Sequence, residues 1–156
     1  MDDDRTRNLA NDLCRLYIAH ALRKKGCTDS IPSSMDRRAT SNARTDAVFD
    51  RLRELADAFE EHNPRAFEEM CAALRINAVT VYANFVDVAS DLFSDGIRWG
   101  RVVALYAFSG ALAVECARRD LKDYVASVNK WASEFVDENL VEWIGANGGW
   151  VRKRGG

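Results

Sequence analysis

Apolar and polar residues follow one another along this chain with the period of α-helices. In the clearest case, Val48, Leu52, Leu55 and Phe59 recur at spacings of four, three and four, and charged residues fill the positions between them. Such a stripe is typical of a surface helix that docks on a core, and a helix that enters another protein's groove carries the same pattern. No stretch alternates as a half-buried strand would, so the pattern predicts an all-α fold.

One stretch departs from the amphipathic pattern. A turn at Ser94-Asp95-Gly96 is followed by a restart at Trp99, and the chain then carries no charge from Val102 to Val114. A helix that is apolar on every side must be surrounded. Spanning a bilayer takes about 20 apolar residues, whereas runs of about 10–14 are more often buried core helices. We therefore predict a central helix wrapped by the others.

These patterns predict the organisation of the whole chain. We expect one domain over residues 1–156, a bundle of about seven or eight helices. A polar connection at about 27–44 is expected to be a flexible loop. Asn63-Pro64 suits a helix start, and the helix that follows would carry Phe67 and Met70 on its apolar side.

Composition narrows the function. A net charge of -2 argues against nucleic acid as a partner, because phosphate binding needs clustered cations. The four cysteines share no metal spacing, and we interpret them as reduced, mostly buried thiols of a cytoplasmic protein. His20 and His62 have no metal-ligand neighbour at three or four residues, and no nucleotide-binding or nucleophile motif is present. We predict no metal site, no cofactor and no enzymatic activity.

Arg101 is the sharpest candidate for a binding residue. It falls in the first turn of the central helix, where a cation opposes the helix dipole, and wholly apolar residues follow it. One interpretation is an ordinary surface arginine, and the other is an arginine at the rim of an apolar groove that binds a carboxylate. Gly100 also has two interpretations, a turn residue or a place where another backbone passes close to the helix. Gly110 suits tight packing of helices in the core.

Four motifs resemble those of the B-cell lymphoma-2 (Bcl-2) family of apoptosis regulators, in the family's order. The first is LFSDGIRWGRVVALYAFSGALAVE at 92–115, and the second is WIGANGGW at 143–150. The third is LRELADAFEE at 52–61, and the N-terminal LCRLYIAHALRKKG at 13–26 resembles the fourth. The similarity spans nearly the whole chain, and its first motif is highly specific.

The resemblance implies a surface hydrophobic groove that binds the amphipathic death-motif helix of pro-apoptotic partners. The ligand would place its aspartate on Arg101, pass closest to the chain at Gly100 and meet a second cation at Arg98. Its apolar side chains would contact a row of positions: Phe59, Phe67, Met70, Val88, Leu92, Ala104 and Phe108. The chain's own death-motif helix would be carried by Val48, Leu52, Leu55, Asp57 and Phe59.

The sequence departs from the family pattern in three ways. Arg98 stands where the family usually has asparagine, which removes a good N-cap and should favour acidic ligands. Ala56 replaces a usual glycine beside Asp57. Many relatives continue into an apolar membrane anchor, which this chain lacks after Arg152-Lys153-Arg154. Either the chain has been shortened or this member is soluble.

Two functions fit the resemblance. The chain could be a survival factor that sequesters death-motif helices, or a pro-apoptotic effector that oligomerises and permeabilises the outer mitochondrial membrane. We favour the survival factor, because the spacing from Phe59 to Gly110 and the GALAVE segment look more like the survival members. We expect a cytoplasmic protein, held at the outer mitochondrial or endoplasmic reticulum membrane where the native chain carries an anchor.

Overall fold

The fold is a bundle of α-helices. The computed structural model describes residues 2–35, 43–62, 64, 65, 67 and 76–150, and that part contains no strand. Three short 3-10 turns occur at Thr28–Ser30, Ser33–Met35 and Lys122–Tyr124. The α-helices are α1 (Asp2–Lys24), α2 (Ala43–His62), α4 (Val81–Leu92), α5 (Trp99–Arg118), α6 (Val125–Asn139) and α7 (Val141–Ala146).

The all-α prediction is confirmed, with a lower helix count. Six α-helices lie in the described part, fewer than the seven or eight predicted. The predicted helix that begins at Pro64 lies mostly outside the described residues, and so does Met70. The predicted loop at about 27–44 contains the first two 3-10 turns, and α2 already begins at Ala43.

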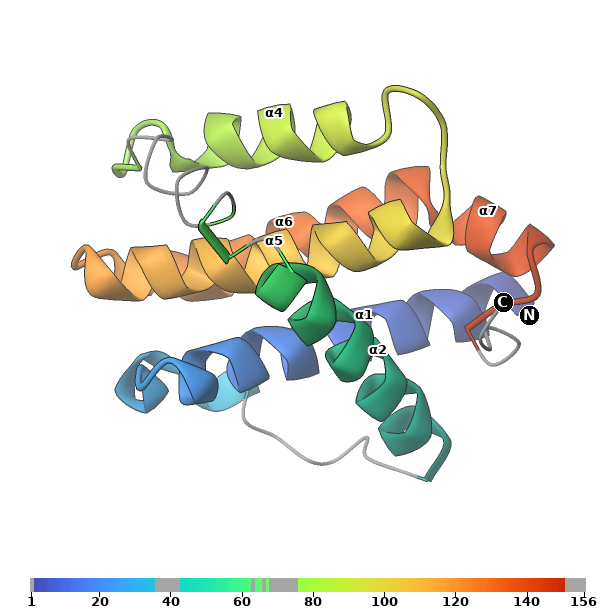
Figure 1. Ribbon diagram of the computed structural model, residues 1–156, viewed down its shortest axis with the longest axis horizontal. Helices are drawn as coiled ribbons and strands as arrows, with labels where there is room; N and C mark the ends of the chain where they lie inside the picture. The colour runs from blue at the N-terminus through green and yellow to red at the C-terminus, as the bar shows by residue number, and fades with distance from the viewer. Residues whose placement is uncertain (1, 36–42, 63, 66, 68–75, 151–156) are drawn as a thin grey trace.

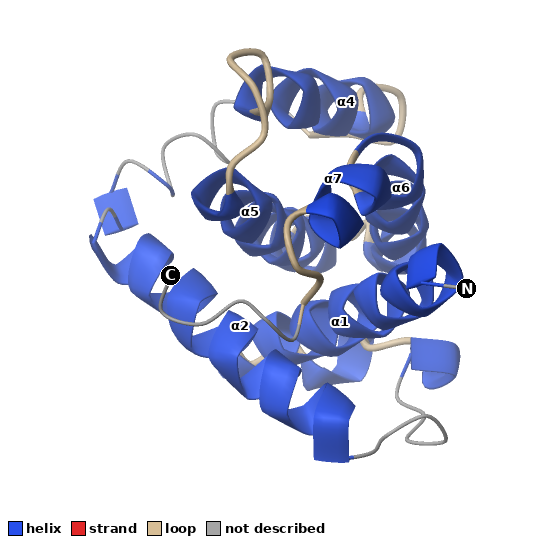
Figure 2. Ribbon diagram, turned by 90° about the vertical axis from the view of Figure 1, so that its right-hand side faces the viewer, coloured by secondary structure: helices blue, strands red, loops and turns tan. Residues whose placement is uncertain are grey.

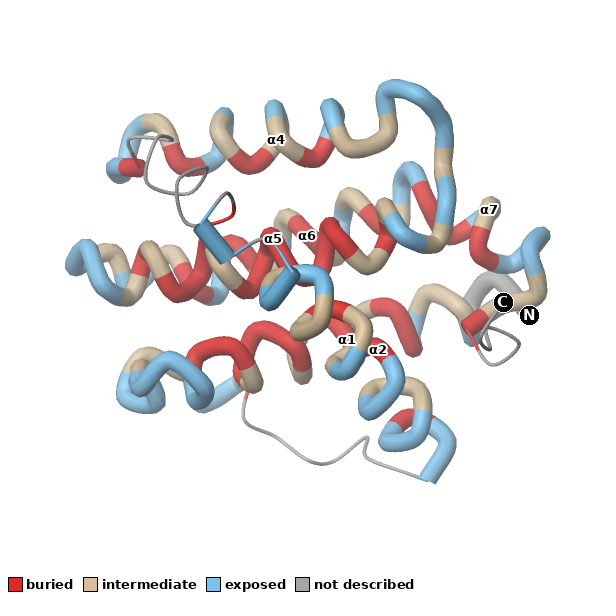
Figure 3. Tube along the Cα trace, viewed as in Figure 1, coloured by how far each residue is buried: buried red, intermediate tan, exposed pale blue. Residues whose placement is uncertain are grey.

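The apolar helix predicted at the centre is α5. In Figure 1, α4 lies on one side of α5 and α1 on the other, while α6 runs alongside and α2 crosses the bundle. The view along the bundle in Figure 2 shows these helices arranged around α5. From Val102 to Val114 every residue is buried except the half-buried Val103 and Ala111 (Figure 3). Exclusion of these side chains from water is the main stabilising term.

Helix α1 packs tightly on α5 because of a glycine. A Cβ added at Gly110 would lie 2.7 Å from Tyr17 Cε2 and 2.9 Å from Ala21 Cβ, closer than real Cβ atoms approach. Glycine therefore lets the two helices come closer than a side chain would permit. The predicted packing role of Gly110 is confirmed.

An aromatic cluster joins the first and second motifs at the N-terminal end of α5. The ring of Trp99 lies 5.1 Å from that of Trp143 and 5.6 Å from that of Trp150. Trp150 returns to the bundle because Gly148 and Gly149 adopt φ of 100° and 71°, values that side-chain-bearing residues rarely take. The cluster fixes the start of α5 against the end of the chain.

Candidate functional site

A cavity of about 460 Å³ lies between α2 and the N-terminal end of α5. This α2–α5 cavity falls in the size range of ligand pockets, and its wall is mainly apolar. The lining residues are Ala47, Val48, Leu52, Leu55 and Phe59 from α2, Trp99, Gly100 and Val103 from α5, and Trp150, with Arg44 and Arg51 also on the wall. The structure thus leaves a large apolar hollow beside Trp99 and Gly100 of the most specific motif.

The apolar stripe of α2 forms one wall of this cavity. Leu52 is buried, Val48 and Leu55 are half-buried, and Phe59 at the end of the stripe is 38% exposed. The ring of Phe59 meets that of Phe67 edge-on, with 6.0 Å between centroids. The stripe therefore does not close fully against α5, and part of its apolar surface stays available to another molecule.

Gly100 stands at the edge of the cavity with open space in front of it. The residue is exposed, and a Cβ added there would meet no atom within 4 Å. Packing within the fold thus gives no reason for glycine at this position, in contrast to Gly110. The open space fits the expectation that a partner passes close to the chain here.

Arg101 lies in the first turn of α5, as predicted, and its guanidinium is bound within the chain. Its Nη1 donates a hydrogen bond of 2.7 Å to the carbonyl oxygen of Leu92, which lies in the last turn of α4. Carbonyls at a helix C-terminus lack helical donors and carry partial negative charge, so a guanidinium suits them. No described carboxylate pairs with Arg101, and the residue does not line the α2–α5 cavity. The half-buried cation lies one residue from the rim at Gly100.

Arg98 caps α5 poorly, as predicted from its replacement of asparagine. Its backbone is extended, with φ of -142° and ψ of 154°, and its side chain makes no capping hydrogen bond. The residue is exposed. It adds a second cation to the start of α5 and leaves the first backbone N–H groups of the helix without a side-chain acceptor at the cap position.

The other predicted groove residues that the structure describes do not line the α2–α5 cavity. Ala104 and Phe108 are buried, 4% and 1% exposed, because α4 packs directly on α5 there and Phe85 stacks on Phe108 at 6.3 Å. Phe67 is also buried, while Val88 and Leu92 are half-buried on α4. Of the nine predicted partner-binding residues that lie in the described part, Phe59 and Gly100 line the α2–α5 cavity. The described positions on α4 and on the buried face of α5 therefore lie apart from the α2–α5 cavity.

Asp57, the expected death-motif aspartate, is bound within the chain. Tyr17 Oη donates to its Oδ1 at 3.3 Å, Lys24 Nζ lies 3.2 Å from Oδ1, and His20 Nε2 lies 3.2 Å from Oδ2. Burial disfavours the charge, but the hydrogen bonds from Lys24 and His20 and their positive charges outweigh it, so the pKa of Asp57 is lowered. These contacts hold α2 on α1.

Sequence reasoning missed this cluster, although α1 carries a signal for it. Tyr17, His20 and Lys24 follow at spacings of three and four, which places them on one helical face. Burial, followed by the charges of Asp57 and Glu60, raises the pKa of Tyr17 well above its usual value, so its hydroxyl remains a donor. Polar residues at helical spacing beside the buried face of this amphipathic helix could have been interpreted as a contact with another helix.

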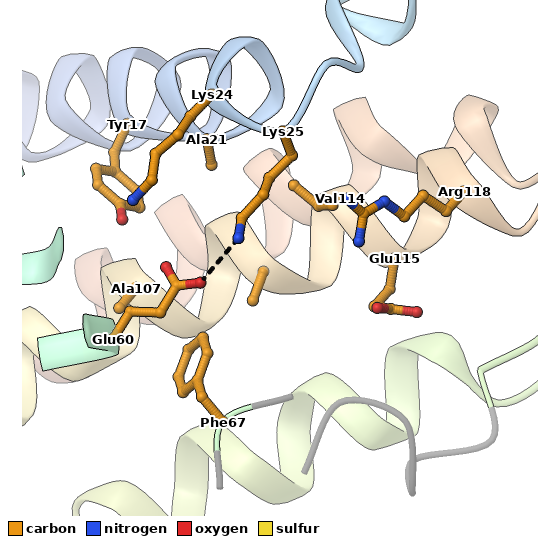
Figure 4. Close-up of a pocket in the computed structure, with 11 residues that line it drawn as sticks. Tyr17, Ala21, Lys24, Lys25, Glu60, Phe67, Ala107, Val114, Glu115 and Arg118 are labelled. Carbon is orange, nitrogen blue, oxygen red and sulfur yellow. Dashed lines mark ion pairs between the residues drawn. The ribbon is translucent and has the colours of Figure 1, made fainter. Parts of the chain in front are cut away.

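A second junction between α1 and α2 lies one turn further along. Figure 4 shows the ion pair between Lys25 and Glu60, whose Nζ and Oε2 atoms are 3.4 Å apart. These side chains border a cavity of about 40 Å³, and Phe67 extends toward it from below. This volume suits one or a few water molecules and not a ligand.

The cysteines and the possible metal ligands remain to be described. Cys14 and Cys116 are buried and free, and burial raises the pKa of Cys14 to about 12 and that of Cys116 to about 11. Such thiols are unreactive. Cys27 is half-buried, and Cys71 lies outside the described residues. No group of three or more His, Cys, Asp or Glu residues in the described part could hold a metal ion.

The comparisons with known proteins agree with this geometry. Residues 52–150 match the model of the Bcl-2 family, apoptosis regulator proteins. Bcl-2-like protein 1 of Rattus norvegicus is 39% identical over 104 residues, 67% of this chain and 45% of the relative. The chain spans about half the length of the curated relatives it matches.

Two solved structures share the fold over nearly the whole chain. Trichoplax adhaerens trBcl-2L2 bound to trBak BH3 superposes with a TM-score of 0.83 at 32% identity, covering 93% of this chain and 94% of that one. Chicken BOK superposes with a TM-score of 0.79 at 30% identity, covering 96% and 93%. The family model matches more than half of this chain. The chain belongs to the Bcl-2 family of apoptosis regulators.

Proposed function

We propose that this protein is a pro-survival regulator that sequesters the death-motif helices of pro-apoptotic relatives. The α2–α5 cavity carries the proposal, because it leaves apolar surface open beside Gly100 and Arg101. Trichoplax adhaerens trBcl-2L2, of closely similar structure, was solved with a BH3 segment bound. The GALAVE segment at 110–115, which resembles the survival members, favours the survival class.

In this mechanism the ligand helix lays its apolar side chains against the stripe of α2. Each side chain that becomes fully buried contributes about 1.5–3 kcal/mol, part of which is lost in ordering the ligand. The ligand's aspartate would reach Arg101. A guanidinium has five N–H donors, so Arg101 can accept a carboxylate and still hold the Leu92 carbonyl. A charge-assisted bond of this kind fixes the register of the helix.

Arg101→Ala tests the proposed site. We expect binding of the Trichoplax Bak BH3 peptide, followed by fluorescence polarisation, to weaken at least about tenfold. The fold should persist, because the variant loses a single hydrogen bond to a backbone carbonyl. Arg118→Ala at the opposite end of α5 is the matched control and should bind normally. Unchanged affinity in Arg101→Ala, or its global unfolding in circular dichroism, would contradict the proposal.

The alternative is a pro-apoptotic effector. One observation supports it: α5 is long and apolar enough to cross a membrane by length and composition, although 67% of its most apolar window is buried in the bundle. A protein of that class would have to release α5 and the contacts around it. The same helix is equally expected at the core of a soluble bundle.

Dye release from liposomes separates the two functions. We would tether the protein to vesicles of phosphatidylcholine, phosphatidylethanolamine and cardiolipin, which mimic the mitochondrial surface where we propose it acts. A survival factor should release no dye with or without the Bak BH3 peptide, and it should block a pore-forming relative. Peptide-triggered release would make the protein an effector.

A further inference from the structure

A second cavity adjoins the α2–α5 cavity at the ends of the chain. This basic cavity has a volume of about 240 Å³ and shares Arg44 and Trp150 with its neighbour. Its other described lining residues are Arg5, Thr6, Leu9, Gly145, Gly148 and Gly149. The apolar α2–α5 cavity and the basic cavity therefore meet at Arg44 and Trp150.

The charged residues on both walls are all arginines. Among the described residues, Arg44 and Arg51 line the α2–α5 cavity, Arg5 and Arg44 line the basic cavity, and no carboxylate lines either one. The chain as a whole has a net charge of -2, so this clustering is local. Arg51 has one weak partner, Glu54, at 3.7 Å on the exposed surface. Because Arg5 follows three aspartates in the sequence, Arg44 and Arg51 carry the argument.

A buried donor lies on the shared wall. Trp150 is only 6% exposed, and its Nε1 has no hydrogen-bond partner among the described residues. A buried indole N–H normally finds an acceptor, and leaving it without one is costly. The two arginines thus offer positive electrostatic potential next to an apolar wall, and the unpaired indole N–H is buried in the same region.

We propose that the basic cavity and the arginines on the wall of the α2–α5 cavity form an acid-binding extension of the groove, resting on the proposed function. The partner is an amphipathic helix whose apolar stripe ends in acidic residues. Its apolar end lies against Val48 and Leu55, and its carboxylates meet Arg44 and Arg51. Continuity with Gly100 and Phe59, which line the same cavity, selects a helical partner over a free amphiphile.

Geometry sets the spacing of the acids. Arg44 and Arg51 are seven residues apart on α2, so they lie on one face about 10 Å apart along the helix axis. A ligand helix lying along α2 matches both arginines when its own acidic residues are about seven positions apart. These two acidic residues of the ligand are distinct from the aspartate that is expected to bind Arg101.

The experiment uses the full chain and extended peptides. The Trichoplax Bak BH3 peptide would be lengthened at either end with a segment carrying two glutamates seven positions apart, or two glutamines as the neutral match. We expect the glutamate peptide extended at one end to bind about fivefold more tightly than its glutamine match, with a smaller gain at high salt. The gain should vanish in Arg44→Gln/Arg51→Gln. It should persist in Arg53→Gln, whose arginine contacts Asp50 at 3.6 Å and lies outside both cavities.

The outcomes distinguish this inference from the proposed function. Equal affinity of the glutamate and glutamine peptides, or a gain that survives the double variant, overturns the acid-binding extension and leaves the groove intact. Failure of the unextended peptide to bind overturns both. Dodecanoate that binds through Arg44 and Arg51, when glutamate gives no gain, would assign the cavities to an anionic amphiphile and also overturn the inference.

Discussion

Helices α1 and α2 both pack on α5, but in opposite ways. At α1 the contact is so close that a Cβ on Gly110 would come within 2.7 Å of the Tyr17 ring. At α2 a cavity of about 460 Å³ remains. Polar contacts from Asp57 to α1 take part in holding α2. One helix therefore belongs to a sealed core, and the other leaves apolar surface open.

This difference separates stability from recognition. Close-packed interiors gain dispersion energy from every contact, whereas a side chain beside a void has no partner on that side. Changes at the α1–α5 contact should therefore cost folding free energy. Changes at the α2–α5 cavity should mainly alter what binds there.

The largest effect is expected from alanine substitutions at the two glycines of α5. Gly110→Ala should lower the free energy of unfolding by about 1–3 kcal/mol, because α1 must move to accept the methyl group. Gly100→Ala should leave it unchanged or raise it by up to about 1 kcal/mol, since alanine favours a helix and the space is open. Urea denaturation of both variants measures the difference.

Peptide binding should reverse the order of the two variants. Gly100→Ala should weaken the Bak BH3 peptide because the methyl group occupies the expected path of the ligand, and Gly110→Ala should bind it whenever it is folded. If Gly100→Ala bound the peptide as well as wild type, the close approach at Gly100 would be wrong. Equal stability of the two variants would remove the contrast between the helices.

The features of α5 that enter this comparison could be predicted from the sequence, because they depend on patterns within one helix. The uncharged run Val102–Val114 identified the central helix, and its small residue Gly110 indicated tight packing. Patterns within one element are readable because a helix fixes which residues share a face.

Contacts between elements were harder to predict. The hydrogen bond from Arg101 is accepted by a backbone carbonyl of α4. Because every residue has a backbone carbonyl, the sequence does not show which one Arg101 binds. Asp57 and its partners on α1 are 33 to 40 residues apart, which spacing alone cannot pair. Phe108 is buried because α4 packs on α5 beside it, and the sequence of one helix does not determine how two helices pack.

Asp57→Asn should give an intermediate effect and tests what holds α2. We expect a loss of about 1 kcal/mol at pH 7, after allowance for solvent screening of the partly exposed pair. The pKa of Asp57 is lower in the folded chain than the unfolded value of about 3.9. Its stabilisation is therefore present above about pH 4 and disappears as the pH falls through the folded-state pKa. The gap between wild type and variant should close in acid, measured by thermal unfolding.

Asp50→Asn provides the control on the same helix. Its carboxylate is 65% exposed and pairs with Arg53 at 3.6 Å, so the substitution should change little at any pH. Were Asp57→Asn as stable as wild type at pH 7, the apolar stripe alone would hold α2. In that case the polar cluster would be incidental to the difference between α1 and α2.

The smallest effect is expected from one added methylene at neighbouring valines of α5. Val103 borders the cavity, whereas Val102 is fully buried. Val103→Ile should be neutral or raise the free energy of unfolding by up to about 0.8 kcal/mol, the value of one buried methylene, while Val102→Ile should lower it through overpacking. Because both residues keep a β-branched side chain in the same helix, helix propensity cancels.

Changes of opposite sign in the free energy of unfolding, measured by denaturation, would confirm that the cavity is spare volume in the fold. If Val103→Ile also weakens the Bak BH3 peptide, that spare volume serves the partner, whereas destabilisation by Val103→Ile would mean that α2 already closes on α5.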